Sequence, residues 1–123
     1  MTEYKLEYNG SIISINSAKS LSWRALKTKV NKLEILLKSI IRKANPPKFF
    51  KFEVEVEYWS KHDVDNIAFT VKCMIDQLVR ENKLIDDNKE YWRKLTITAN
   101  QELKNNTIIF IRFTHFRILS EKT

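Results

Sequence analysis

The residues of this chain best suited to chemistry are the acidic side chains of two short segments. The segment Asp63–Asn66 (DVDN) places two carboxylates two positions apart with an amide beside them. A second acidic pair, Asp86-Asp87, follows after a stretch long enough to form one helix. Carboxylate oxygens are the ligands that Mg²⁺ and Mn²⁺ prefer. The chain around them is basic, with 22 Lys and Arg against 15 Asp and Glu and a net charge of +7. Acidic metal ligands in a basic chain are typical of enzymes that cleave nucleic acid, because basic residues bind phosphates while the cation polarises one of them.

Each acidic segment also has a purely structural interpretation. Asp63 or Asp65 could cap the start of a helix, where Asp is among the favoured residues. The pair at 86–87 could belong to a turn, where the same residue type is common. An EF-hand loop is excluded, because it requires an oxygen ligand and then Gly where this chain has Ile67 and Ala68. A structural zinc site is disfavoured as well, because the chain has one Cys and two well-separated His.

The positive charge is concentrated in the first part of the chain. Residues 1–51 contain eleven Lys and Arg against three Glu, a balance of +8, whereas residues 52–123 contain eleven against twelve acidic residues, a balance of −1. This asymmetry indicates an anionic partner, although a basic helix on a merely soluble protein would give a similar count. The residues that we expect to contact the phosphates of such a partner are Arg24, Lys27, Lys38 and Lys61.

Length and composition favour one ordered domain in the cytoplasm. The 123 residues leave room for a single hydrophobic core. The longest apolar runs are too short to span a bilayer, and the N-terminal residues lack the basic-then-apolar pattern of a signal segment. Cys73 is the only cysteine, which fits a reducing compartment. We therefore expect one domain over residues 1–123, cytoplasmic and without a membrane partner.

The N-terminal part predicts a β-hairpin followed by a long basic helix. Tyr4–Ile15 alternates around Asn9-Gly10, a dipeptide suited to a type I′ turn. Ser20 or Ser22 would then cap a helix that the segment 45–47 (NPP) ends, because proline cannot continue it. The apolar positions of this helix recur every three or four residues. They are Trp23, Leu26, Val30, Leu33, Leu37 and Ile40.

The remaining chain predicts a strand, a second helix and two further strands. Phe50–Tyr58 alternates with period two, which places its three glutamates on one face that we expect to be solvated and turned away from the substrate. A helix over Val64–Asn82 follows, and then strands near Tyr91–Ala99 and Thr107–Phe113. The expected fold class is α+β, a small mixed β-sheet with two main helices in the order β-hairpin–α–β–α–β–β.

The acidic segments belong to a longer pattern that resembles the RusA family of Holliday junction resolvases. The signature of that family is a DxDN motif, a lysine in the following helix, a D-x-L segment and a closing DD. The corresponding residues here are Asp63–Asn66, Lys72, Asp76–Leu78 and Asp86-Asp87. The match in order and spacing covers roughly residues 61–88, and outside it only the length and the order of elements agree. The interval from Asp65 to Lys72 is seven residues where many relatives have four, and both intervals return to the same helix face.

The resemblance implies a metal-dependent endodeoxyribonuclease that cuts four-way DNA junctions in recombination and repair. It implies that Asp63, Asp65 and Asp87 bind Mg²⁺, for which Mn²⁺ can substitute, that Lys72 is the essential basic residue, and that Asn66 supports the first two carboxylates. It also implies a homodimer, often encoded by a phage or prophage. Two other functions stay open, namely a basic DNA-binding module without catalysis and a small interaction protein whose charges only keep it soluble.

Lys72 has a structural alternative of its own. Asp76 lies four residues further along the predicted helix, where the two side chains would form an ion pair worth a few tenths of a kcal/mol. The sequence leaves both roles of this lysine open.

Helix geometry predicts that one chain cannot easily close the metal site. A continuous helix over residues 64–82 spans roughly 27 Å, with Asp63 and Asp65 at its first end and Asp87 just beyond its second. Carboxylates that share a cation each place an oxygen within about 2–2.6 Å of it. The short stretch before Asp87 recovers only about 10 Å when extended. We therefore expect two chains to pack this helix antiparallel, so that Asp63 and Asp65 of one face Asp87 of the other.

Overall fold

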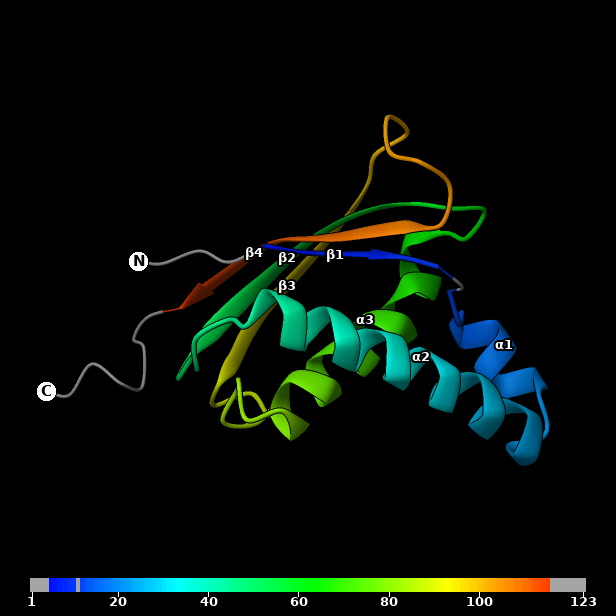
Figure 1. Ribbon diagram of the computed structural model, residues 1–123. Helices are drawn as coiled ribbons and strands as arrows, with labels where there is room; N and C mark the ends of the chain where they lie inside the picture. Colours follow the sequence, from blue (N-terminus) through cyan, green and yellow to red (C-terminus); the bar gives the residue numbers. More distant parts are fainter. Residues whose placement is uncertain (1–4, 11, 116–123) are drawn as a thin grey trace, which may run out of the picture.

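The chain forms a four-stranded mixed β-sheet with its long helices packed on one face (Figure 1). The computed structural model describes residues 5–10 and 12–115, and for residues 111–115 it describes the backbone only. The predicted α+β class with a mixed sheet is confirmed. The elements in chain order are β1 (Leu6–Asn9), α1 (Ile15–Ser20), α2 (Trp23–Ala44), β2 (Phe52–Trp59), α3 (Val64–Arg80), β3 (Trp92–Ala99) and β4 (Thr107–His115).

Strand β2 lies inside the sheet, and its successive side chains point to opposite faces. The strand order is β1-β4-β2-β3, with β2 parallel to β3 and antiparallel to β4, and with β1 antiparallel to β4. The alternation predicted for β2 is present, since Phe52, Val54, Val56 and Tyr58 are buried while the glutamates between them are half-buried. In Figure 1 both α2 and α3 lie on one side of the sheet. The glutamates therefore lie on the face opposite the helices.

The predicted N-terminal β-hairpin is wrong. Its first strand forms as β1, but residues 12–14 form no strand and α1 begins at Ile15. Gly10 does not adopt the positive φ that a type I′ turn requires. Its missing side chain serves close packing instead, because a Cβ at this position would lie 3.0 Å from the Tyr8 hydroxyl oxygen and 3.3 Å from a methyl carbon of Leu36. The predicted hairpin residues Tyr4 and Ser11 lie outside the described residues.

The chain after β1 is held by α3 rather than by a returning strand. Thr70 is buried, and its Oγ1 accepts a hydrogen bond from the Ile13 N–H at 3.0 Å and donates one to the Ile13 carbonyl at 3.0 Å. Both backbone groups that Ile13 would have offered to a second hairpin strand are thereby satisfied. The next residue, Ser14, caps α1, because its Oγ accepts from the Ser17 N–H at 3.0 Å.

We expect Thr70→Val to destabilise the protein by about 1–3 kcal/mol, because valine fills the same space but leaves both backbone groups of Ile13 buried without a partner. Thr28→Val is the matched control. Thr28 is exposed on α2 and donates only to the Arg24 carbonyl at 3.1 Å, so its loss should change the free energy of unfolding by less than about 0.5 kcal/mol. Chemical denaturation of both variants measures the difference, and equal stabilities would show that the bonds to Ile13 contribute nothing.

Helix α2 forms where predicted, but its first turns do not join the core. Of the two candidate caps, Ser22 is the one used, since its Oγ accepts from the Ala25 N–H at 3.2 Å. Asn45 ends the helix in the left-handed conformation, with φ 48°. Trp23, predicted as part of the apolar stripe, is 74% exposed, because this end of α2 lies beside α1 beyond the sheet (Figure 1). The buried residues of α2 are Leu33, Leu37 and Ile41.

Helix α3 is continuous and ends at Arg80, two residues before the predicted end. Its buried apolar stripe faces the sheet and includes Ile67, Val71, Met74, Ile75 and Leu78. None of the helices in the described part of the chain combines the length and the apolar character needed to cross a bilayer.

Candidate metal and nucleic-acid site

Asp63 and Asp65 lie at the exposed start of α3. Asp63 occupies the N-cap position, but its side chain makes no capping hydrogen bond, and its backbone carbonyl instead accepts from the Asn66 N–H at 2.9 Å. Asp65 lies in the first turn. Among the described residues, neither carboxylate takes part in a hydrogen bond or ion pair. Asp63 thus occupies the helix-cap position, but its carboxylate does not cap the helix.

The loop before Asp63 is held by Tyr58 at the end of β2. The Tyr58 hydroxyl donates to the His62 carbonyl at 2.8 Å, and the His62 N–H donates to the Ser60 Oγ at 3.1 Å. Burial, and then the negative charges of Asp63 and Asp65, raise the pKa of Tyr58 above its ordinary value. The phenol therefore stays protonated at neutral pH and continues to donate. Through this bond the sheet fixes the point at which the acidic segment begins.

Asn66 binds the start of α1 rather than either aspartate. Its Oδ1 accepts from the Asn16 N–H at 3.3 Å, and it lies four residues before Thr70 on the same face of α3. Asn66 and Thr70 together hold α1 beside the acidic end of α3. This anchor was not predicted from the sequence, although two polar residues four apart at the edge of an apolar stripe are the pattern that could have indicated it.

Lys72 and Asp87 are in direct contact. The Lys72 ammonium group donates to Asp87 Oδ2, fifteen residues away, and to Asp76 Oδ1 at 2.5 Å. Burial alone would lower the pKa of Lys72, but the hydrogen bonds to Asp76 and Asp87 raise it above its ordinary value. The hydrogen bond from Lys72 lowers the pKa of Asp87. At neutral pH this contact therefore joins an ammonium group and a carboxylate, and the ion pair with Asp76 is present beside it.

The neighbours of Asp87 shape the loop that carries it. Asp86 accepts from the Asp87 N–H at 2.7 Å through one oxygen and from the Asn88 side-chain amide at 3.2 Å through the other. The Asn88 Oδ1 accepts from the Glu90 N–H at 2.9 Å. The turn interpretation thus describes Asp86 and Asn88, whereas the side chain of Asp87 is directed at α3.

Within one chain, Asp63 and Asp65 at the start of α3 do not come together with Asp87 in the loop after it. The loop brings Asp87 back only as far as Lys72 and Asp76, and Lys72 lies about 10 Å beyond Asp65 along the axis of α3. In the part of the chain that the structure describes, no three His, Cys, Asp or Glu side chains come together as a metal site. Asp63 and Asp65 have the donor chemistry that Mg²⁺ prefers, but a single chain does not assemble them with Asp87.

Three of the four basic residues predicted to bind phosphates are exposed. Arg24 and Lys27 lie in the first turns of α2, and Lys61 comes just before the acidic segment. The Lys27 Nζ lies 4.9 Å from the centre of the Trp23 ring. Lys38 is half-buried beside a shallow depression between α2 and α3.

No protein-family model matches this chain, and no curated protein matches it either. The resemblance to the RusA family rests on the residues of the acidic pattern and their spacing.

Proposed function

We propose that the protein is a metal-dependent, structure-selective endodeoxyribonuclease that resolves Holliday junctions by paired phosphodiester hydrolysis in DNA recombination and repair. The observation that most supports this function is the contact of Lys72 with Asp87, which joins two separate parts of the RusA-like pattern. The exposed carboxylates of Asp63 and Asp65, which no described side chain neutralises, support it as well. The one cysteine, Cys73, is buried and free, which supports a reducing, cytoplasmic location.

Asp63 and Asp65 of one subunit, with Asp87 of a second copy, would hold Mg²⁺ or Mn²⁺. When bound, the cation supplies a polarised phosphate and a bound water of lowered pKa. Lys72 has a raised pKa, so it stays protonated and offsets the negative charge that builds up on the phosphate. The sequence-independent affinity for the DNA backbone, which weakens as salt rises, would come from Arg24, Lys27, Lys38 and Lys61.

The proposed enzyme is a homodimer because its site needs two chains. Packing α3 antiparallel to its symmetry mate brings the start of one helix towards the Asp87 loop of the other. Two-fold symmetry then creates two equal sites, which suits paired cuts in a junction that is itself nearly two-fold.

Cleavage of a labelled four-way junction with and without Mg²⁺ tests the proposed function. We expect paired nicks only when the cation is present, and little cutting of linear duplexes with the same sequences. Salt-dependent junction binding without cleavage in Mg²⁺ or Mn²⁺ would favour a non-catalytic basic DNA-binding module instead. The carboxylates at the start of α3 argue against that alternative, because without a cation they repel phosphate. Absence of any salt-dependent DNA binding would favour an interaction protein.

We expect Lys72→Ala to lower the cleavage rate by about tenfold or more while changing junction binding little, because the lysine acts on charge that develops in the transition state. Single-turnover cleavage and junction binding at fixed salt separate the two effects. Lys43→Ala removes an exposed lysine of a different helix, α2, and is the control for lost charge. If Lys72 serves only the ion pairs with Asp76 and Asp87, its loss will shift the melting temperature and leave cleavage unchanged.

A further inference from the structure

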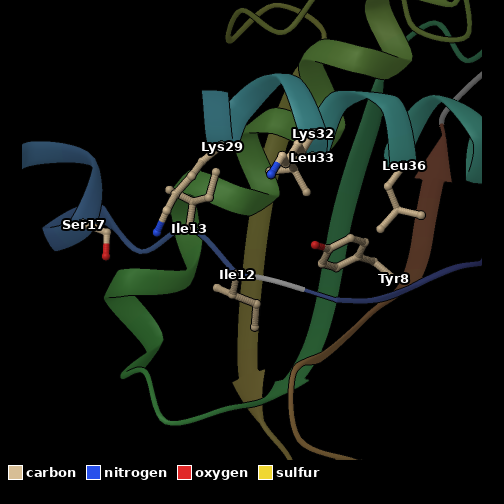
Figure 2. Close-up of a pocket in the computed structure, with 8 residues that line it drawn as sticks. All are labelled: Tyr8, Ile12, Ile13, Ser17, Lys29, Lys32, Leu33 and Leu36. Carbon is tan, nitrogen blue, oxygen red and sulfur yellow. The ribbon is translucent and has the colours of Figure 1, made fainter. Parts of the chain in front are cut away.

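A cavity of about 330 Å³ opens between β1, the segment that leads into α1, and the middle of α2 (Figure 2). This volume lies at the lower end of the range of small-molecule sites in proteins. Ser17 of α1 and two lysines of α2 contribute the polar part of its lining. The apolar part comes from Tyr8, Ile12, Ile13, Leu33 and Leu36.

The two lysines, Lys29 and Lys32, make one side of the cavity strongly positive. They lie three residues apart on α2, so their Cβ atoms are about 5–6 Å apart. Both are exposed, and neither forms an ion pair with a described acidic residue. Two ammonium groups at this spacing can bind one phosphate between them through charge-assisted hydrogen bonds.

Most of the cavity lining is apolar, which suits an apolar group. Tyr8 is almost fully buried, and its burial raises its pKa to about 12, so the phenol stays neutral and does not repel an anion. Leu33 and Leu36 add aliphatic surface from α2. A flat ring attached to a phosphate is the chemistry of a nucleotide, and unpaired bases bind in aromatic and aliphatic pockets of this kind.

The cavity and the acidic end of α3 share one chain segment. Ile13 lines the cavity and is bound to Thr70 through both of its backbone groups, while Asn16 is bound to Asn66. Thr70 lies only about 7.5 Å beyond Asp65 along the helix axis. Successive nucleotides of one strand in a duplex are about 3.4 Å apart along the axis, so the step from Asp65 to Thr70 corresponds to about two nucleotides, and Thr70 is joined to the cavity through Ile13.

We propose that this cavity binds one unpaired nucleotide of the substrate DNA, with its base among the apolar side chains and its phosphate between Lys29 and Lys32. The choice of DNA as the partner rests on the proposed nuclease function, and the charge balance of +8 over residues 1–51 complements it. A phosphate alone would leave the apolar lining unused. A nucleoside alone would leave the two lysines unused.

Titration of thymidine 5′-monophosphate into the methyl-labelled protein, without divalent cations, tests the site directly. We expect saturable NMR shifts of the methyl groups of Ile12, Ile13, Leu33 and Leu36, with weaker effects from thymidine or inorganic phosphate. Phosphate that binds as tightly as the nucleotide, with the methyl signals unmoved, would overturn the proposal. Benzoate that binds the cavity as tightly as the nucleotide would overturn it too, because the site would then accept any aromatic anion.

The double variant Lys29→Gln/Lys32→Gln should weaken nucleotide binding roughly tenfold, since two charge-assisted contacts are lost. Lys43→Gln/Lys104→Gln removes the same amount of charge from exposed positions elsewhere and should bind like the wild type; equal weakening in both would contradict the site. Because no cleavage is needed, the two proposals can fail separately. Nucleotide binding without junction cleavage would sink only the nuclease proposal, and cleavage with unmoved cavity methyl signals would sink only the cavity proposal.

Discussion

Asp65→Asn and Asp87→Asn should each abolish junction cleavage while the fold and DNA binding persist. An amide is an uncharged and poorer ligand for a hard cation than a carboxylate, and loss of several kcal/mol of transition-state stabilisation corresponds to a rate reduction of roughly a thousandfold or more. The Asp65 side chain has no hydrogen-bond partner among the described residues, so its replacement breaks no contact there. Removal of a negative charge should leave the affinity for phosphate equal or higher.

Cleavage rates in Mg²⁺, junction binding without a divalent cation, and thermal melting measure these three expectations separately. Glu53→Gln is the matched control, because it also removes one negative charge but lies on the face of the sheet opposite the helices. It should cut at the wild-type rate. If Asp65→Asn and Asp87→Asn also cut at the wild-type rate, the proposed site is wrong.

Sequence periodicity correctly predicted the elements in which apolar residues recur regularly on one buried face. The period-two pattern of β2 and the apolar stripe of α3 each fix one buried face, and both elements form within two residues of their expected bounds. The prediction of an N-terminal hairpin was wrong because a long-range contact determines the conformation of that segment. Thr70 takes both backbone groups of Ile13, and no local signal around Asn9-Gly10 could reveal a partner 57 residues away.

The candidate site was predicted in its residues but not in its contacts. The resemblance to the RusA family singled out Lys72 and Asp87, yet their contact depends on how the loop after α3 folds back. Leu84 determines that path, because it is buried and forms a parallel bridge with Phe49. The bridge belongs to tertiary packing, and sequence periodicity over so short a loop carries no information about it. The bond from the Tyr58 hydroxyl to the His62 carbonyl was missed for another reason, because the alternation of β2 indicates that Tyr58 is buried but not which group its hydroxyl contacts.

Mixing an Asp65→Asn chain with an Asp87→Asn chain should restore nicking of the junction, although each variant alone is inactive. The structure supports this expectation, because Asp87 returns only to the middle of α3 beside Lys72 and stays about 10 Å short of Asp65 along the axis. If each site takes Asp65 from one chain and Asp87 from the other, a heterodimer has one site with both substitutions and one site with none. A single intact site cuts one strand, so the product should be nicked rather than fully resolved.

Differently tagged chains, purified through both tags, show that heterodimers have formed, and strand-specific labels then report the nicks. The control is a mixture of Asp63→Asn and Asp65→Asn chains. Both substitutions lie on the same side of the proposed shared site, so every site in that heterodimer keeps one lesion and the mixture should stay inactive. Because only the pairing across subunits distinguishes the two mixtures, activity in the first alone identifies a shared site. If confirmed heterodimers of the first mixture do not nick, each site is built within one chain and the antiparallel packing of α3 must be abandoned.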